Sequence, residues 1–392
     1  MTKDIYVVAG KRTPFGSFGG ALSDIPATVL GSTAITTLLA SIGLPGDAVD
    51  EVIIGQVLAG GCGQAPARQA MRNAGIPDRV SALTINKVCG SGLKAVMLGA
   101  DAIRLGDSAV VIAGGMESMS LAPHFLKKAR TGYRMGNGEL VDLMLFDGLT
   151  DPYTGRHMGE IGEASAARNS LSRDAQDTFA RASYQKAQAA VREGLFSDEI
   201  ATVLKQVKGV ETPIAEDEEP FKVDFERLGT LKPVFRKDGT ITAGNASSIN
   251  DGAAMLLLAG EAAIHSWNLT PTARIVAQAT ESRHPDEFPE APIGAIAKVC
   301  AKAGLAVGAI DLFEINEAFA SVPLLAMKAH NIPGEKVNVN GGACAIGHPI
   351  GASGARLAMT VIRELKRRQL RYGLATLCIG GGEAVAVIFE RL

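Results

Sequence analysis

The chain has 392 residues, of which 47% are hydrophobic and 20% charged, and its 39 basic and 41 acidic side chains leave a net charge of -2. This near balance excludes the basic field that draws a protein to nucleic acid or to an anionic membrane, and apolar runs such as residues 253–259 are far shorter than the roughly 20 residues that span a bilayer. Because a strand-like run begins as early as Ile5, we expect no signal or transit peptide and a cytoplasmic protein.

Short β-branched runs alternate with helical stretches through the first 120 residues. In chain order the sequence predicts strand 5–9, helix 27–42, strand 52–55, helix 66–74, strand 82–86, helix 92–105 and strand 109–113. This alternation is typical of an α/β protein with a mostly parallel sheet. Catalytic groups in such sheets gather at the carboxyl ends of the strands.

The same order of elements recurs from residue 273. The second half is predicted to contain strand 273–279, helix 293–303, strand 311–315, helix 317–330, strand 337–340, helix 354–368 and strand 373–378. The glycine-rich segments of the two halves also match, because Gly-Gly-Met-Glu at 114–117 corresponds to Gly-Gly-Gly-Glu at 380–383. Several matches in one order indicate a duplicated unit.

Residues 121–249 have no counterpart in this repeat, and we interpret them as an inserted loop domain. The predicted domains are therefore 1–120 plus about 250–270, then 121–249, and finally 271–392. Strand 253–259 is expected to return to the first sheet as an added edge. The basic stretch at 127–134 is interpreted as a solvated face rather than a ligand site.

The five cysteines form neither a disulfide framework nor a zinc site, because they are odd in number, widely spaced and free of a CxxC motif. They are Cys62, Cys89, Cys300, Cys344 and Cys378. Cys89 stands in the segment NKVCGSG, between a predicted strand and a predicted helix. The helix N-terminus should stabilise its thiolate and lower the pKa below about 8.5, which suits a nucleophile. The alternative is a buried structural cysteine.

His348 stands at the equivalent elbow of the second half, in the segment GHPIGASG. A helix N-terminus disfavours imidazolium, so this histidine should be a neutral base near pH 7. If the two halves pack about a pseudo-twofold axis, Cys89 and His348 face each other as nucleophile and base. The alternative is a histidine whose role is structural.

Two further segments follow predicted strands of the second half. Cys378 ends one strand, and the glycines after it, beginning with Gly380, offer backbone N–H groups for an oxyanion site. Core packing is the alternative for Cys378. Asn316, in the segment EINEAFA, could cap a helix or hold a water, and these two roles are compatible.

Together these four segments closely resemble the signatures of the thiolases, and the resemblance extends over essentially the whole chain. It implies two βαβαβαββ halves stacked as a five-layer αβαβα sandwich, with an inserted loop domain. It also implies a reversible Claisen condensation of two acetyl-CoA molecules to acetoacetyl-CoA and CoA through an acyl-cysteine. No metal or redox cofactor is needed, since CoA thioesters are themselves the substrates. Members of the family form tetramers or dimers, so we expect a homo-oligomer.

The resemblance assigns a role to each catalytic residue. It implies that Cys89 is acylated, that His348 deprotonates it, and that Cys378 removes or returns the α-proton of the second acyl-CoA. Asn316 would hold a water that binds one thioester oxygen together with His348. The N–H groups of Cys89 and Gly380 would bind the other oxygen.

The substrate site is read from the same resemblance. His157 and Met158 match a segment of the short-chain members, which lies over the pantetheine and the acyl group. Ser247 and Ala243 match positions that touch pantetheine, while Phe235 and Phe319 match apolar pocket walls. For these two phenylalanines, ordinary packing explains the sequence equally well.

Three positions depart from the family pattern. Ser248 stands where glycine is usual, Phe288 where short-chain members often have methionine, and Pro220 near where an arginine often stacks on adenine. Lys222 is a candidate substitute for that arginine. A bulky Phe288 should narrow the acyl tunnel.

Four other functions are alternatives to this one. A broad-range degradative 3-ketoacyl-CoA thiolase remains the nearest alternative. A β-ketoacyl carrier-protein synthase would have a second histidine in place of Cys378, and a non-catalytic acyl-CoA-binding protein would be expected to have lost a catalytic residue. A nucleotide-dependent oxidoreductase would show GxGxxG after the first strand, and this chain does not.

Overall fold

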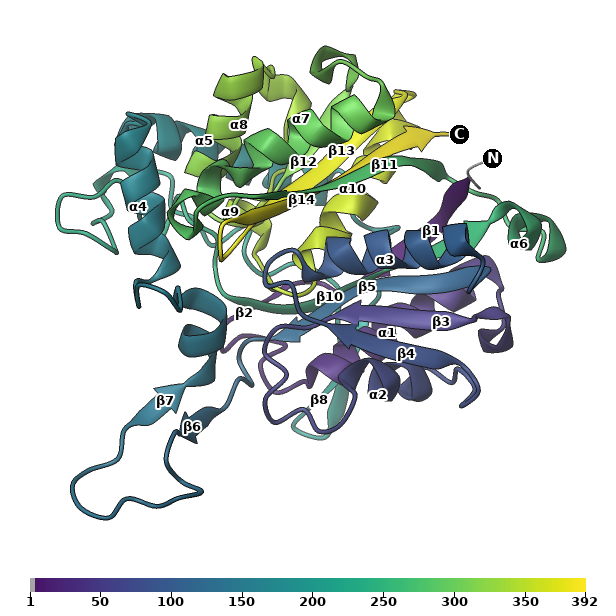
Figure 1. Ribbon diagram of the computed structural model, residues 1–392, viewed down its shortest axis with the longest axis horizontal. Helices are drawn as coiled ribbons and strands as arrows, with labels where there is room; N and C mark the ends of the chain where they lie inside the picture. The colour runs from purple at the N-terminus through teal and green to yellow at the C-terminus, as the bar shows by residue number, and fades with distance from the viewer. Residues whose placement is uncertain (1–3) are drawn as a thin grey trace.

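The structure, a computed structural model, describes residues 4–392 and shows two halves of the same topology (Figure 1). The first half begins with β1, whose β-branched run favours an extended chain. Its elements are β1 (Ile5–Arg12), α1 (Ala27–Ile42), β3 (Glu51–Gly55), α2 (Pro66–Asn73), β4 (Ser81–Ile85), α3 (Ser91–Leu105), β5 (Val110–Ser118) and β10 (Asn250–Gly260). The predicted elements of this half are confirmed, except that β1 extends to Arg12 rather than ending at 9 and β5 extends to Ser118 rather than ending at 113.

The second half repeats the pattern with one strand missing. Its elements are β11 (Ala273–Ser282), α7 (Ala291–Ala303), β12 (Leu312–Ile315), α8 (Ser321–His330), α9 (Ala343–Ile346), α10 (Ser353–Arg368), β13 (Tyr372–Ile379) and β14 (Glu383–Arg391). The prediction of a strand at 337–340 is wrong. Asn338 has a left-handed φ of 46°, which interrupts an extended chain. Its side-chain amide instead bonds the N–H and C=O of Ile315, each at 2.8 Å, and so completes the edge of β12.

The strand order shows the duplication directly. The first half runs β4-β3-β5-β10-β1, and the second half continues as β11-β14-β13-β12. Counted outward from the junction, corresponding strands occupy corresponding places in the two halves. The junction is a short antiparallel pairing of β1 with β11, through Tyr6 with Arg274 and Val7 with Ala273.

Two expectations about the sheet are wrong. The pairs β3–β4, β3–β5 and β12–β13 are parallel, but the other main-sheet pairs are antiparallel, so the sheet is mixed rather than mostly parallel. The strand predicted at 253–259 is not an edge, because β10 lies between β1 and β5. Every residue of β10 from Asn250 to Ala259 is buried, as expected for a strand that is covered on both faces.

Helices and sheets alternate in five layers (Figure 1). Helices α1 and α2 cover the outer face of the first half, and α7 and α8 cover the outer face of the second. Helices α3 and α10 lie between the two halves, where one apolar core joins residues of both, including Leu93, Leu357 and Phe389. The five-layer αβαβα sandwich is therefore confirmed.

Residues 119–249 leave the sheet after β5 and return to it at β10. They contain β6 (His124–Leu126), β7 (Leu140–Asp142), a π-helical turn (Met144–Leu149), α4 (Met158–Arg168), α5 (Arg173–Arg192), β8 (Val203–Val207) and β9 (Val210–Ile214). The β6–β7 hairpin and its long connection project from the body as an arm (Figure 1). Within residues 4–392, no helix is both long enough and apolar enough to cross a membrane.

Candidate active site

Cys89 lies in a tight elbow between β4 and α3. Val88 has a left-handed φ of 45°, a conformation that β-branched residues rarely adopt. The hydroxyl of Ser91 holds the turn, because it accepts a hydrogen bond from the N–H of Lys87 at 2.8 Å and donates to the carbonyl of Val88 at 2.7 Å. The elbow thus presents a partly exposed Cys89 at its tip.

His348 lies in the corresponding elbow, between α9 and α10. The preceding Gly347 has a φ of 103°, and a Cβ at this position would lie 2.4 Å from the side chain of Asn250. Only glycine fits here. The Oδ1 atom of Asn250 accepts the N–H of His348 at 2.9 Å, which fixes the backbone that carries the imidazole.

The tautomer of His348 follows from its contact with Ser353. The Ser353 hydroxyl donates its only proton to the carbonyl of Pro349 at 2.9 Å, so its oxygen accepts from Nδ1–H of His348 at 2.5 Å. Nε2 is then unprotonated and lies 3.4 Å from the side-chain nitrogen of Asn316. Burial, together with the nearby Arg356, lowers the pKa of His348 to about 4. This agrees with the expected neutral ring near pH 7, and the role of His348 as a base stays a prediction.

The two elbows meet where α3 and α10 begin. A Cβ on Gly92 would lie 2.7 Å from the carbonyl oxygen of Gly351, and one on Gly354 would lie 2.5 Å from the nitrogen of Leu93. These glycines let the two helix starts touch backbone to backbone. As a result, Cys89 and His348 line the same cavity.

This cavity has a volume of about 290 Å³. Eight of the predicted site residues line it, namely Cys89, His157, Met158, Phe235, Ser247, Phe319, His348 and Gly380, as do the two departures Ser248 and Phe288. The sequence analysis missed Val88, Met119, Leu145, Gly148, Leu149, Val234, Ala246, Ile249, Ala318 and Ile350. Most of these are apolar residues in loops. Ala243 is exposed and is not part of the cavity wall.

One wall of the cavity is aromatic. The imidazole of His157 stacks on Phe235, with ring centres 4.9 Å apart and planes 20° apart. Phe319 then meets Phe235 edge-on at 6.1 Å and Phe288 at 6.4 Å. His157 is also the N-cap of α4, where its Nδ1 accepts the N–H of Gly159 at 3.0 Å. Burial lowers the pKa of His157, which favours a neutral ring.

Cys378 lies at the end of β13, fully buried behind Cys89. Burial raises the pKa of its thiol well above the ordinary value, and the proximity of Cys89 raises it further. The backbone N–H groups of Gly380 and of Cys89 itself act to lower the pKa of the Cys89 thiol. These are the two N–H groups that the resemblance assigns to the oxyanion site.

The expected low pKa of Cys89 is wrong for the ligand-free site. Burial raises the pKa to about 11, although the N–H groups of Gly380 and Cys89 act in the opposite direction. Beside a histidine whose pKa is about 4, Cys89 is therefore a thiol at rest.

Asn316 does not cap a helix, because α8 begins only at Ser321 with Ala320 as its N-cap. The side chain of Asn316 is instead buried beside His348, and its Oδ1 atom has no hydrogen-bond partner among the described residues. A buried amide oxygen without a partner is costly, and a bound water is the usual remedy.

Lys222, the candidate substitute for the arginine expected near Pro220, contacts residues of its own segment and of the first half. Its ammonium donates to the hydroxyl of Ser17 and lies 3.7 Å and 3.9 Å from the carboxylates of Glu219 and Glu218. The carbonyl of Pro220 accepts a hydrogen bond from Gln188 at 2.8 Å. The contacts of residues 218–222 therefore attach the loop domain to the first half.

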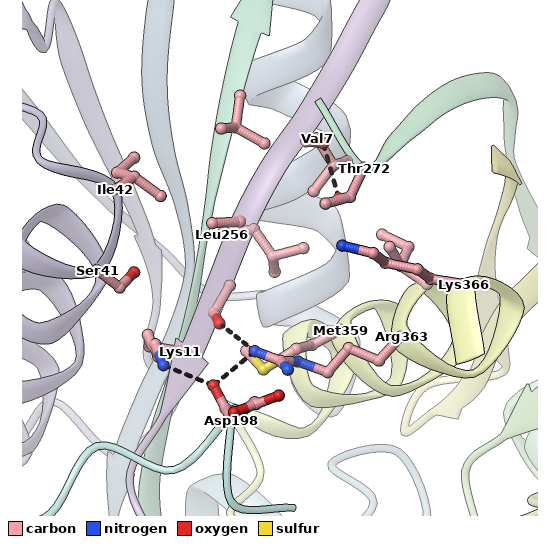
Figure 2. A pocket seen from close by; sticks show the side chains of 14 residues that line it. Val7, Lys11, Ser41, Ile42, Asp198, Leu256, Thr272, Met359, Arg363 and Lys366 are labelled. Atoms are coloured by element: carbon pink, nitrogen blue, oxygen red, sulfur yellow. Dashed lines mark hydrogen bonds between the residues drawn. The ribbon is translucent and has the colours of Figure 1, made fainter. Parts of the chain in front are cut away.

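A second cavity, of about 280 Å³, lies between β1, the end of α1 and α10 (Figure 2). Two of its cationic side chains bind backbone carbonyls. Lys11 donates to the carbonyl of Asp198 at 2.5 Å, and Arg363 donates to the same carbonyl at 2.7 Å and to that of Gly10 at 3.2 Å. No cysteine or histidine lines it. Cys89 and His348 line the first cavity instead.

Comparison with known families agrees with this geometry. Residues 5–262 match the family described as "Thiolase, N-terminal domain", and residues 269–391 match "Thiolase, C-terminal domain". This chain belongs to the thiolase family. It is therefore an acyltransferase.

Curated relatives and solved structures match this thiolase over its full length. The acetyl-CoA acetyltransferases of Pseudomonas aeruginosa and Chromobacterium violaceum are each 50% identical, and each alignment covers 99% of this chain and 100% of the relative. The crystal structure of the Bacillus anthracis acetyl-CoA acetyltransferase superposes with a TM-score of 0.97 at 40% identity. That of human mitochondrial 3-ketoacyl-CoA thiolase superposes with a TM-score of 0.96 at 38% identity. Both alignments cover 100% of this chain and 99% of the other.

Proposed function

We propose that this thiolase condenses two acetyl-CoA molecules into acetoacetyl-CoA and CoA, and catalyses the reverse cleavage, through an acetyl group carried on Cys89. The observation that carries the proposal is the meeting of the two elbows, which places Cys89 and the neutral His348 in one cavity. The full-length similarity to acetyl-CoA acetyltransferases supports acetyl-CoA as the substrate.

In the first half-reaction, Nε2 of His348 takes the proton of Cys89 as the sulfur attacks the thioester carbon. The N–H groups of Cys89 and Gly380, which act to lower the pKa of the Cys89 thiol, stabilise the developing oxyanion. The bond between the acetyl carbon and the CoA sulfur then breaks, and His348 returns the proton to the CoA thiolate. Acetyl-Cys89 and CoA are the products of this step.

In the second half-reaction, Cys378 in its thiolate form takes the α-proton of the second acetyl-CoA, and the resulting enolate attacks acetyl-Cys89. The bond between the acetyl carbon and the Cys89 sulfur then breaks, acetoacetyl-CoA is released, and Cys378 returns the proton to the Cys89 thiolate. An acylated Cys89 cannot ionise, so acylation removes the contribution of Cys89 to the raised pKa of Cys378. A water held by Oδ1 of Asn316, beside Nε2 of His348, stabilises the enolate oxygen. Every proton transfer is assigned to a side chain, so we invoke no cofactor.

The cavity wall favours a short acyl group. Phe288 is only 3% exposed and packs against Phe319 at the aromatic wall, so a long acyl chain would have to displace a buried ring. We therefore expect acetoacetyl-CoA to be cleaved with a higher kcat/KM than longer 3-ketoacyl-CoAs, each poorly accommodated methylene costing on the order of 1 kcal/mol or more.

The assay that tests the proposal mixes the protein with CoA and 3-ketoacyl-CoA substrates of four, six, eight and ten carbons and follows the loss of enolate absorbance. Fast cleavage of the four-carbon substrate, falling with length, is the expected result. A maximum at eight carbons or beyond would favour the degradative, broad-range alternative. Absence of cleavage with every substrate would contradict a thiolase reaction.

We further propose that the protein is a homo-oligomer, a tetramer or a dimer. Two exposed features support assembly: β4 is an open sheet edge on which Leu83 is 45% exposed, and the β6–β7 arm carries Met135 at 95% exposure. Unpaired edges and exposed apolar side chains are commonly covered by a second copy.

A cytoplasmic location is also proposed. All five cysteines are free thiols, and the mechanism requires two of them in reduced form. A reducing compartment maintains that state. Measuring enzyme activity in separated cell fractions would test this location.

A further inference from the structure

Glu117 is a fully buried carboxylate that the mechanism above does not use. It lies near the end of β5, in the first half, and does not line the cavity. Placing a carboxylate in the interior is expensive unless hydrogen bonds compensate it. Its contacts therefore indicate what it does.

The carboxylate accepts three backbone N–H groups from two loops. Oε2 accepts from Val57 and from Gly351, each at 3.0 Å, and Oε1 accepts from Leu58 at 3.1 Å. Val57 and Leu58 follow β3 in the first half, whereas Gly351 belongs to the second half, three residues after His348. One side chain thus joins the two halves at the catalytic elbows.

The loop that carries His348 fits closely around this carboxylate. A Cβ on Gly351 would lie 2.8 Å from Oε2 of Glu117 and 3.0 Å from the carbonyl of Gly55. A Cβ on Gly115 would lie 1.9 Å from the carbonyl of Gly351. The loop is therefore seated directly on the ends of β3 and β5, with no side chain between them.

The duplication supplies a second observation. Glu383 corresponds to Glu117, and it forms an ion pair with Lys87 in the elbow of Cys89. Each glutamate therefore contacts the catalytic elbow of the opposite half. The Glu383 pair is partly exposed, with its side chains 34% and 21% accessible, whereas the Glu117 contacts are buried.

We propose that Glu117 is a positioning residue that holds the loop of His348 against the first half and so sets the distance between the base and Cys89. The inference rests on the roles proposed for Cys89 and His348. Glu117 acts through Gly351 and touches no substrate.

The surroundings of Glu117 give the proposal a pH signature. The titratable groups that face it are Asp251 on β10 and the thiols of Cys62 and Cys89. Burial and Asp251 raise the pKa of Glu117 to about 7, although its three N–H partners act in the opposite direction. The carboxylate is therefore charged above about pH 7, and below it the protonated acid accepts weaker hydrogen bonds.

The test compares the wild-type enzyme with Glu117→Gln. Cys89 acetylation by acetyl-CoA is measured in a single turnover across the pH range by quenching and peptide mass spectrometry. In the wild type the rate should rise as pH increases through about 7. In Glu117→Gln an amide nitrogen replaces one acceptor oxygen, so acetylation at pH 8 should be about 10- to 100-fold slower and should lack the rise near 7.

Asp311→Asn is the matched control. Its carboxylate also accepts two backbone N–H groups, from Arg371 at 2.9 Å and Tyr372 at 2.8 Å, but at the start of β12, away from the cavity. This variant should acetylate Cys89 at the wild-type rate with the wild-type pH profile. Glu383→Gln should have a smaller effect than Glu117→Gln, because exposed ion pairs contribute little.

Wild-type rates and an unchanged pH profile in Glu117→Gln would overturn the inference and leave the proposed function intact. If that variant does not fold, the pH profile of the wild-type enzyme tests the inference by itself. A rate of Cys89 acetylation that is constant between about pH 6 and 8 would also overturn the inference. A wild-type enzyme that forms no acetyl-Cys89 would overturn the proposed function, and the inference with it.

Discussion

His348 is poised by contacts on both sides of its ring. Ser353 holds Nδ1–H, Asn316 lies at Nε2, and Arg356 keeps the ring neutral. The base is therefore ready before substrate arrives, whereas the thiol of Cys89, with a pKa of about 11, is not ionised. Because the thiol is protonated and the ring can accept a proton, we expect acylation to depend on His348.

Replacing His348 by alanine should therefore slow acylation of Cys89 by about 10² to 10⁴-fold, because the variant lacks the base to which we assign the proton of Cys89. The measurement is the burst of CoA release from acetyl-CoA in stopped flow. Circular dichroism shows whether the variant is folded. A normal burst in a folded His348→Ala protein would contradict the pairing of His348 with Cys89.

Cys378→Ser should separate the two half-reactions. Cys378 is assigned only to the α-proton of the second substrate, so the variant should still acetylate Cys89 but lose condensation by about 10²-fold or more. Exchange of the α-protons of acetyl-CoA with deuterated water, followed by NMR, should be lost in parallel. If turnover is unchanged, Cys378 is structural.

At the scale of single residues, sequence motifs predicted which residues belong to the site better than they predicted the surroundings of those residues. Cys89, His348 and Gly380 could be found because they stand in short segments with recognisable chemistry. The pKa of Cys89 could not, because the local helix start is visible in the sequence whereas the burial that raises the pKa depends on the tertiary structure. Apolar lining residues such as Leu145 and Ile350 carry no local signal of their own.

Between elements, the decisive contact is the one between the starts of α3 and α10. Gly92 and Gly354 are duplicated counterparts, and each approaches the backbone of the other half. Because backbone atoms cannot rotate away as a flexible side chain does, this contact fixes the separation of the two elbows.

Gly92→Ala should therefore destabilise the protein by about 1 to 3 kcal/mol, even though alanine favours helix over glycine. Its Cβ would meet the carbonyl of Gly351 at 2.7 Å and the nitrogen of Ala355 at 3.0 Å. Gly99→Ala in the same helix is the control, since its closest neighbours are methyl groups of Leu258 and Val111 at 3.0 Å. The free energy of unfolding of both variants is measured in urea. Equal values would contradict the close contact between the starts of α3 and α10.

Element types were largely readable from periodicity, but their neighbours in the sheet were not. The fully apolar stretch at 253–259 signalled burial on both faces, which fits an interior strand better than the predicted edge. At 337–340 the residue types suggested a strand, but Asn338 adopts a left-handed conformation and its side chain bonds β12. Only the tertiary partner reveals that role.

At the scale of the whole molecule, the arm is the segment least explained by the chain's own packing. The connection between β6 and β7 carries Tyr133 and Met135, which are exposed in the single chain. Lys127 lies over the ring of Phe146 at 4.5 Å, which anchors the base of the arm. The exposed Tyr133 and Met135 suit a contact with a second copy.

Replacing residues 127–138 by a short turn should therefore lower the native mass measured by light scattering, from four chains to two or from two to one. Met135→Ser, which alters the tip alone, should weaken the assembly and make its mass depend on protein concentration. An unchanged mass in the shortened variant would assign assembly to another surface.

The central claim is that Cys89 carries the acetyl group, and peptide mass spectrometry after incubation with acetyl-CoA tests it most directly. The account predicts one added acetyl group on the peptide that contains Cys89, removed by CoA and absent from Cys89→Ala. Acetylation confined to Cys62, Cys300 or Cys344, or an unmodified Cys89 in an active enzyme, would contradict it.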